Sequence, residues 1–245
     1  MSGHSKWSSI KHKKGAADAK RGQLFTKLTR ALIVAAKDGG ADPSANLALQ
    51  NAIDKARAAS MPKDNIERAI ARGAGTGADA AQYEHISYEG YGPGGVAVYV
   101  DVLTDNRNRT AGEVRHTFAR HDGNLAESGA VAWLFERKGV ILVDGSVDED
   151  ELMLVAADAG ADDIQQEGSS FEVTCAPESL HTVRESLEAA GIDVAEAEST
   201  MLPKTTVEIG DEATAKKVLR LIDALEENDD VQDVFANFDI PESVL

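Results

Sequence analysis

The residues with the clearest chemical potential are cations at the start of the chain. Residues 1–30 contain eight Lys and Arg but a single acid, Asp18, and they include a tryptophan, Trp7. Lysine and arginine neutralise phosphate groups, and an exposed aromatic ring can stack on a nucleobase. We therefore expect this segment to bind nucleic acid; the alternative is a solvated basic tail with Trp7 packed on the helices. The expected ligands are Lys6, Trp7, Lys11, His12, Lys13, Lys14, Lys20, Arg21, Lys27 and Arg30.

A second cationic feature follows an expected strand. Arg107 and Arg109 are two residues apart in the segment 105–110, and two further arginines follow downstream. A guanidinium group can bind phosphate through two parallel hydrogen bonds, which makes both residues candidate nucleic-acid ligands. Pairing with the nearby acids Asp105 and Glu113 is an equally good interpretation.

A glycine-rich segment at 90–95 contains the spacing G-x-G-x-x-G. A dinucleotide site requires such a loop to leave a strand and open a helix, whereas this one leads into the expected strand Val96–Leu103. We therefore exclude a Rossmann site. A tight turn before the strand and an exposed loop that approaches RNA or a partner both remain open.

Other chemistry finds little support in the sequence. The six histidines show no H-E-x-x-H or paired Cys/His spacing, so we expect no metal site. Neither G-x-S-x-G nor a phosphate-binding G-x-x-x-x-G-K-[ST] loop occurs, and we expect no enzyme, cofactor or small-molecule substrate.

The single cysteine, Cys175, ends an apparent strand and is interpreted as a buried apolar residue. One cysteine also favours a reducing compartment, so we expect a cytoplasmic protein. The acid pair Asp229-Asp230 is interpreted as a solvated turn.

Charge is distributed unevenly along the 245 residues, whose net charge is −17. Residues 1–75 hold 14 Lys and Arg against 6 Asp and Glu, while residues 139–245 hold 5 against 27. A polyanion is attracted to the first region and repelled by the second. No apolar run approaches the roughly 18 residues that span a bilayer, and the basic start lacks the apolar core of a secretory signal.

The first third of the chain has the pattern of a helical bundle. A helix is expected from about Gly15 to Asp38, with an apolar face and a cationic face that carries Lys27 and Arg30. A second helix is expected to open at Asp42-Pro43. For a third helix, which ends at Gly73, Asp64 and Glu67 resemble a capping box.

The remainder alternates strands and helices. Residues 140–201 have the order β-α-β-β-α-β, and the β-α-β segments 83–138 and 204–240 together repeat it. The first of these segments is expected to contain a helix capped by Thr110 and a strand at Ala130–Glu136, with the next strand at Val140–Val143. The expected fold is α+β, with a helical bundle followed by two ferredoxin-like domains, one inserted in the other. The expected domains are a basic helical domain at 1–80, a ferredoxin-like domain at 81–138 plus 203–245, and an acidic inserted ferredoxin-like domain at 139–202.

Several long motifs resemble the YebC family, and the resemblance spans the whole chain. They are Gly3-His4-Ser5-Lys6-Trp7, Ile10-Lys11-His12, Asp18-Ala19-Lys20-Arg21-Gly22, Phe25-Thr26-Lys27, Met61-Pro62-Lys63-Asp64-Asn65-Ile66-Glu67-Arg68-Ala69-Ile70, Tyr88-Glu89-Gly90-Tyr91-Gly92-Pro93-Gly94-Gly95, Thr104-Asp105-Asn106-Arg107-Asn108-Arg109-Thr110 and Glu113-Val114-Arg115-His116.

The resemblance implies three domains, one helical and two α/β, in a cytoplasmic protein without a cofactor. Bacterial members are usually described as probable transcriptional regulators, and mitochondrial relatives as translational activators. The resulting expectation is a non-enzymatic, DNA-binding regulator of transcription. The alternative is a factor that binds RNA or the ribosome, through rRNA or tRNA, and assists protein synthesis. Both targets are polyanions, so the charge distribution does not separate them.

Overall fold

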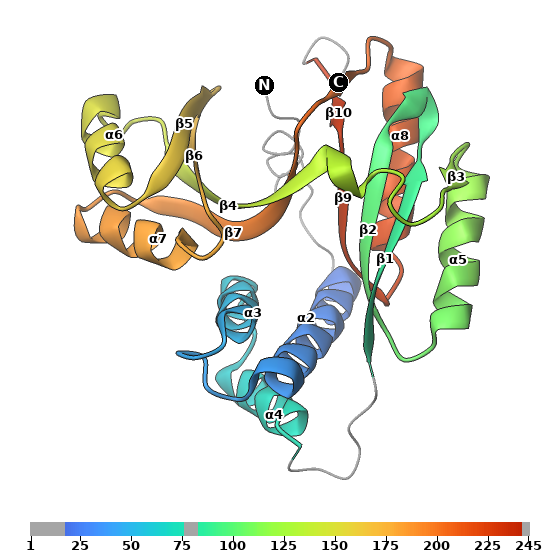
Figure 1. Cartoon of the computed structure of the whole chain (residues 1–245), viewed down its shortest axis with the longest axis horizontal. Helices are drawn as coiled ribbons and strands as arrows, with labels where there is room; N and C mark the ends of the chain where they lie inside the picture. The colour runs from blue at the N-terminus through green and yellow to red at the C-terminus, as the bar shows by residue number, and fades with distance from the viewer. Residues whose placement is uncertain (1–17, 76–82, 242–245) are drawn as a thin grey trace. The chain divides into compact units, whose positions relative to one another are not determined.

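The computed structural model describes residues 18–75 and 83–241, with the backbone alone for residues 18–21 and Glu167 (Figure 1). The described chain divides into two compact units. One comprises residues 135–204, and the other comprises the described residues before 135 and after 204. The fold is α+β, as predicted from the alternation of strands and helices.

The unit 135–204 is ferredoxin-like. Its elements are β4 (Phe135–Asp144), α6 (Glu149–Asp158), β5 (Ala161–Glu167), β6 (Ser170–Cys175), α7 (Leu180–Ala189) and β7 (Val194–Pro203). The strands form an antiparallel sheet in the order β5-β6-β4-β7. Leu152 of α6 and Leu187 of α7 pack with Ile141 and Val173 of the sheet in one core. The β-α-β-β-α-β order predicted for this segment is confirmed.

Cys175 lies in that core at the end of β6, as its sequence context predicted. Burial, followed by the nearby charge of Asp162, raises the pKa of the thiol to about 11. Since the thiolate is the reactive species, we expect a chromogenic aromatic disulfide to modify the native protein at least ~100-fold more slowly than free cysteine. Unfolding in guanidinium should restore the ordinary rate. Rapid modification of the folded protein would show that the thiol is accessible.

Three helices form the first part of the other unit: α2 (Asp18–Gly39), α3 (Leu47–Ala58) and α4 (Lys63–Gly73). We call these helices the head. Their core includes Leu32, Ile33, Leu49 and Ile53. Gly73 lets α4 approach α2 closely, because a Cβ atom there would lie 2.3 Å from the carbonyl oxygen of Ile33. The predicted start of the first helix at Gly15 lies outside the described residues.

Two predicted helix starts in the head are wrong. The second helix begins at Leu47, after the N-cap residue Asn46, while Asp42 forms a turn by accepting the Ser44 N–H at 2.9 Å. An asparagine suits the cap because its amide also donates to the Ala35 and Gly40 carbonyls, which a carboxylate cannot do. The third helix begins at Lys63 after Pro62, with no side-chain cap, so the Asp64–Glu67 capping box does not form.

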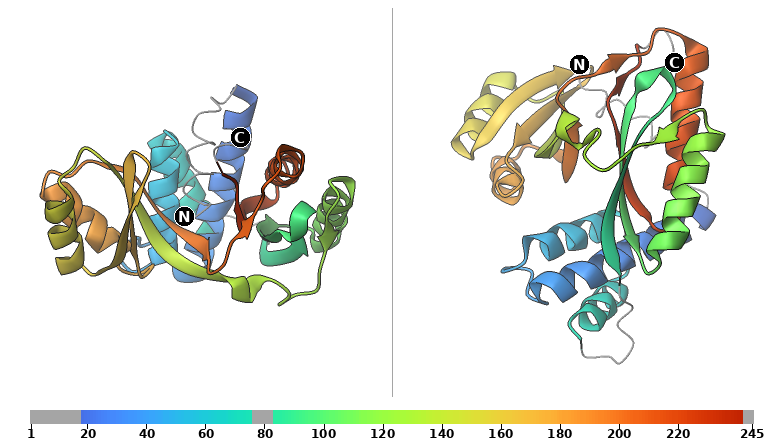
Figure 2. Two further views of the ribbon diagram at one scale, coloured as in Figure 1. Left: turned by 90° about the horizontal axis from the view of Figure 1, so that it is seen from above. Right: turned by 45° about the vertical axis from the view of Figure 1, so that its right-hand side comes forward.

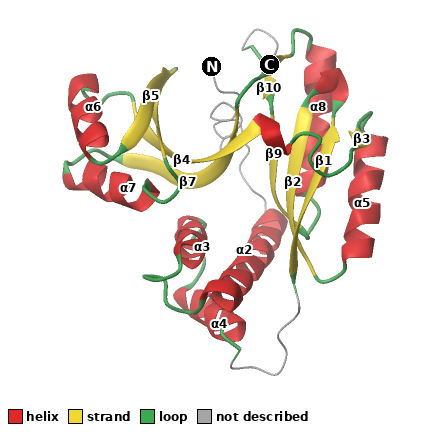
Figure 3. Ribbon diagram, in the orientation of Figure 1, coloured by secondary structure: helices red, strands yellow, loops and turns green. Residues whose placement is uncertain are grey.

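The second part of this unit is built on the sheet β3-β1-β2-β9. Its elements are β1 (Glu84–Tyr91), β2 (Ala97–Thr104), α5 (Arg107–Arg120), β3 (Asn124–Leu125), β8 (Val207–Glu208), α8 (Glu212–Glu226), β9 (Val231–Ala236) and β10 (Phe238–Asp239). Helices α5 and α8 cover the same face of the sheet (Figures 2 and 3). Strands β8 and β10 form a separate parallel pair.

Two expectations for this part are corrected. It begins with the antiparallel hairpin β1–β2, which is absent from the predicted β-α-β order. The hydrophobic pattern does not indicate β1, because the buried positions of this strand are Glu89 and Gly90 rather than large apolar residues. The predicted strand Ala130–Glu136 is instead a 3₁₀ turn, η2 (Ala132–Leu134), followed by the single long strand β4.

Candidate nucleic-acid interface

The predicted cations of the chain start lie mainly beyond the described residues. Lys6, Trp7, Lys11, His12, Lys13 and Lys14 all belong to this group. Lys20 and Arg21 lie in the first turn of α2, where the structure describes the backbone but not the side chains. Among the predicted ligands, the structure therefore describes the side chains of Lys27, Arg30, Arg107 and Arg109.

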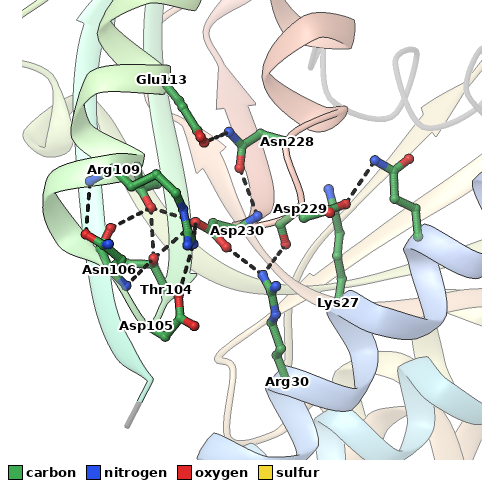
Figure 4. A network of polar contacts seen from close by, with 12 residues as sticks. Lys27, Arg30, Thr104, Asp105, Asn106, Arg109, Glu113, Asn228, Asp229 and Asp230 are labelled. Atoms are coloured by element: carbon green, nitrogen blue, oxygen red, sulfur yellow. Dashed lines mark hydrogen bonds and ion pairs between the residues drawn. The ribbon is translucent and has the colours of Figure 1, made fainter. Parts of the chain in front are cut away.

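Lys27 binds the last residue of α8, and Arg30 binds the turn between α8 and β9 (Figure 4). Lys27 Nζ donates to the Glu226 carbonyl at 2.5 Å, and Arg30 Nη1 donates to the Asp229 carbonyl at 2.6 Å. The last carbonyls of a helix lack intrahelical donors and lie at the negative end of its dipole, so cations stabilise them. This face of α2 thus attaches the head to α8, and we leave Lys27 and Arg30 out of the proposed interface.

Asp230 is the centre of this network. Its carboxylate accepts hydrogen bonds from Arg30 at 2.8 Å, Arg109 at 2.7 Å, Thr104 at 3.1 Å and Thr110 at 2.6 Å. The residue is only 3 % exposed, so the interpretation of Asp229-Asp230 as a solvated turn is wrong for Asp230. These four donors come from two segments distant in sequence, Arg30 of α2 and the segment from Thr104 to Thr110, which no local pattern could reveal.

The pKa of Asp230 reflects this environment. Burial alone would raise the pKa, but the hydrogen bonds from Arg109, Thr110 and Thr104 and the charge of Arg109 outweigh burial and lower it. The carboxylate is therefore stabilised in its ionised form.

The segment from Thr104 to Thr110 builds the start of α5. Asn106 is the N-cap, and its side chain accepts the Arg109 N–H at 3.1 Å. The predicted cap at Thr110 is therefore wrong, since α5 begins at Arg107 and the Thr110 hydroxyl binds Asp230 instead. Arg109 also contacts Asp105 at 3.0 Å, so its guanidinium is engaged within the protein, as the pairing interpretation anticipated. The hydrogen bonds that Arg109 donates to Asp230 and Asp105 raise the pKa of its guanidinium above the ordinary value.

Arg107 and Arg115 remain available on the outer surface of α5. Both are exposed, and neither guanidinium has an acidic partner in the described part of the chain. The half-buried Tyr88 of β1 lies beside α5, and its hydroxyl donates to the Arg107 carbonyl at 3.4 Å. Burial raises the pKa of this phenol, and the two nearby positive charges partly oppose that effect. We call Tyr88, Arg107 and Arg115 the Arg107–Arg115 surface.

This surface combines the two components that a nucleic-acid contact uses. Its guanidinium groups can bind phosphate oxygens, and an aromatic ring lies beside them. Positions 107 and 115 are eight residues apart on one helix, so their Cα atoms are separated by about 12 Å along the axis. The sequence analysis indicated Arg107 as a ligand, and Arg115 is one of the two further arginines that follow downstream.

The glycine-rich segment has a clear structural role. A Cβ atom at Gly90 would lie 2.6 Å from the Phe118 ring of α5, and one at Gly92 would lie 2.9 Å from Leu221 of α8. These glycines allow the hairpin β1–β2 to pack closely against both helices. Only Gly94 and Gly95 are exposed, in the 3₁₀ turn η1 (Pro93–Gly95) between the two strands.

The sequence analysis missed Glu89. This buried carboxylate accepts three backbone hydrogen bonds, from Gly129 at 2.6 Å, Val131 at 2.6 Å and Ala132 at 2.7 Å. Burial would raise its pKa, but these three N–H donors lower it. Glu89 thereby fixes the loop that follows β3. A lone acid within a glycine-rich motif gives no indication of this role.

Two further properties concern only the described residues. No set of three or more His, Cys, Asp or Glu side chains is arranged there to hold a metal ion. In the same ranges, no helix combines the length and apolar character needed to cross a membrane.

Comparison with known proteins gives consistent matches along the chain. The family model described as "TACO1/YebC protein N-terminal domain" matches residues 5–76, and that described as "TACO1/YebC second and third domain" matches residues 83–238. A protein of Rubrobacter xylanophilus is 59% identical over 246 residues, which cover 100% of this chain and 98% of the relative. One of Geobacter sulfurreducens is 55% identical over 240 residues, covering 98% and 96%. Both are named probable transcriptional regulatory proteins.

A solved structure is also similar. The crystal structure of a conserved hypothetical protein from Aquifex aeolicus superposes with a TM-score of 0.81 and 52% sequence identity. The alignment covers 93% of this chain and 94% of that one.

Proposed function

The chain belongs to the TACO1/YebC family, and on that premise we propose that it is a nucleic-acid-binding regulator of gene expression. It acts by binding rather than by catalysis. Phosphates are contacted by the cations of residues 1–21 and by the Arg107–Arg115 surface. The names of the relatives support a regulatory role, because they are described as probable transcriptional regulatory proteins.

The observation that carries the proposal is the exposure of Arg107 and Arg115. The chain has a net charge of −17, and many of its described cations pair with neighbouring acids, as Lys63 does with Glu67 and Lys138 with Asp162. Two arginines that lack acidic partners and flank an aromatic side chain can bind an external anion without first breaking an internal ion pair. Duplex DNA is the first target, in keeping with transcriptional regulation.

A second candidate target is the ribosome. The unit 135–204 contains 17 Asp and Glu against 4 Lys and Arg, a net charge of −13. A bare duplex repels such a unit, whereas a mixed surface of protein and RNA can accommodate it. This observation favours a translation factor that binds ribosomal RNA or tRNA through the same cations.

Replacing Arg107 and Arg115 together by glutamine is expected to weaken binding to the nucleic-acid target about tenfold in ~0.1 M salt. The slope of log K against log salt should become shallower by about 2, because two phosphate contacts are lost. Binding is measured by fluorescence anisotropy for duplex DNA and by co-sedimentation for ribosomes, each over a salt series.

The matched control is K216Q/K217Q, which removes the same charge from α8 at residues that pair with Glu212 and Asp122. This variant should bind within about twofold of the wild type. Equal losses in the two double variants would mean that net charge, and not the Arg107–Arg115 surface, governs binding. DNA affinity that depends on sequence and persists at high salt supports the transcriptional role, and ribosome association without it supports the translational one.

A further inference from the structure

Helix α6 exposes large apolar side chains on its outer face. Met153 is 50% exposed and Leu154 is 66% exposed. They lie with Asp150, Ala157 and Asp158 at the spacing i, i+3, i+4, i+7 and i+8, which places all five on one side of a helix. All five are exposed, and we call them the α6 stripe.

The core of the unit does not include the residues of this stripe. The opposite side of α6 supplies Leu152 and Ala156 to the core, and both are fully buried. The helix start is secured separately by Asp148, whose side chain accepts the Glu151 N–H at 3.0 Å. Exposed neighbouring apolar side chains with no internal role are typical of surfaces that contact another molecule.

Charge indicates which molecule fits. Asp150 and Asp158 flank the apolar centre of the stripe, and the surrounding unit has a net charge of −13. Two of the four Lys and Arg residues of the unit pair with other acids, Lys138 with Asp162 and Arg184 with Glu188. A nucleic acid or an acidic protein is repelled here, whereas a cationic partner is attracted.

We propose that the α6 stripe is a docking surface for a basic, amphipathic helical segment of another protein. Apolar side chains of the partner cover Met153 and Leu154, and its Lys or Arg residues lie opposite Asp150 and Asp158. The surface is small, so the contact is weak and reversible, and part of its strength is lost at high salt. This proposal is independent of the nucleic-acid interface.

The test uses the full chain and a fluorescein-labelled synthetic peptide that presents leucines on one helical face and lysines on the other. Binding is followed by anisotropy at low and high salt, with a Leu/Glu peptide of the same pattern for comparison. We expect micromolar binding of the Leu/Lys peptide and none of the Leu/Glu peptide. Equal binding of the two peptides, or no binding of either, overturns the proposal.

Two matched pairs of variants locate the site. Leu154→Ser should weaken binding about tenfold, while Leu47→Ser, which alters a leucine 42% exposed in the head, should change it less than twofold. D150N/D158N should weaken binding about tenfold at low salt and less at high salt. E185Q/E188Q removes the same charge from α7 of the same unit and should have little effect. All four alter exposed residues, so circular dichroism should show an intact fold.

Three results would overturn the assignment. Equal losses in the two charge variants, with no effect of Leu154→Ser, would show attraction to the acidic unit as a whole. Self-association in sedimentation equilibrium that Leu154→Ser abolishes would identify a second copy of this chain as the occupant. Tighter peptide binding by K11Q/K13Q/K14Q would show that the basic start of the chain itself competes for the stripe.

Discussion

Asp230→Asn is expected to lower the free energy of unfolding by about 3 kcal/mol, because it leaves two guanidinium groups without the buried carboxylate that binds them. The carboxylate binds two guanidinium groups and two hydroxyls, and an amide of the same shape can neither balance the charge nor accept all four hydrogen bonds. Urea denaturation followed by circular dichroism measures the loss.

Asp229→Asn is the matched control. Among the described residues, the Asp229 carboxylate accepts one exposed hydrogen bond, from Gln23, and the Asp229 carbonyl would still bind Arg30 after the substitution. We expect a change of less than about 0.5 kcal/mol. Equal destabilisation by the two substitutions would contradict the central role of Asp230 in the network.

The pH dependence of stability gives a second readout of the same prediction. The native pKa of Asp230 lies below the unfolded value of about 4, so its stabilising contribution is complete above that pH and is lost as the pH falls through the native pKa. The difference in stability between the wild type and Asp230→Asn should therefore be constant above about pH 5 and shrink in stronger acid. Protonation of Glu89, whose pKa is also lowered, should destabilise both proteins equally in that range.

Local patterns predicted the unit 135–204 well. Its helices have apolar residues at core spacing, and α6 begins after a capping aspartate, Asp148. The order of elements followed from the sequence, although β4 begins at Phe135 and is longer than the expected strand Val140–Val143. The buried state of Cys175 followed in the same way.

The hairpin strand β1 could not be predicted by the same reasoning. Its buried residues are an acid that binds three backbone N–H groups of a loop some 40 residues away and a glycine that makes room for Phe118. Both are dictated by tertiary contacts, and neither produces a period of two in hydrophobicity. The predicted starts of these two helices were wrong for a related reason, since the cap residues Asn46 and Asn106 also form hydrogen bonds outside their own helices.

The sequence predicted which residue types form the candidate site, but it did not predict the contacts that each side chain makes. Arg107 and Arg109 are two residues apart and look equivalent in the sequence, yet Arg109 turns toward Asp230 and Arg107 faces solvent. Asp230, the acid that binds Arg109, lies more than 100 residues later in the chain. Lys27 and Arg30 likewise formed a cationic face in the sequence, but the fold uses that face to bind the end of α8.

K11Q/K13Q/K14Q is expected to have the largest effect on binding. The three lysines belong to a segment with a net charge of +7 over residues 1–30, and each is expected to neutralise one phosphate. Loss of three such contacts should reduce affinity about 100-fold near 0.15 M salt. K204Q/K216Q/K217Q removes three lysines from the acidic part of the chain and is the matched control, for which we expect a change within about threefold.

The salt dependence of binding by the wild type and K11Q/K13Q/K14Q, measured side by side on duplex DNA and on ribosomes, tests the central claim most directly. With about five phosphates contacted, the wild type should give a slope of log K against log salt near −4 on its target, and the variant a slope near −2. If the variant bound both targets with the affinity and slope of the wild type, the basic start of the chain would not be a phosphate-binding element.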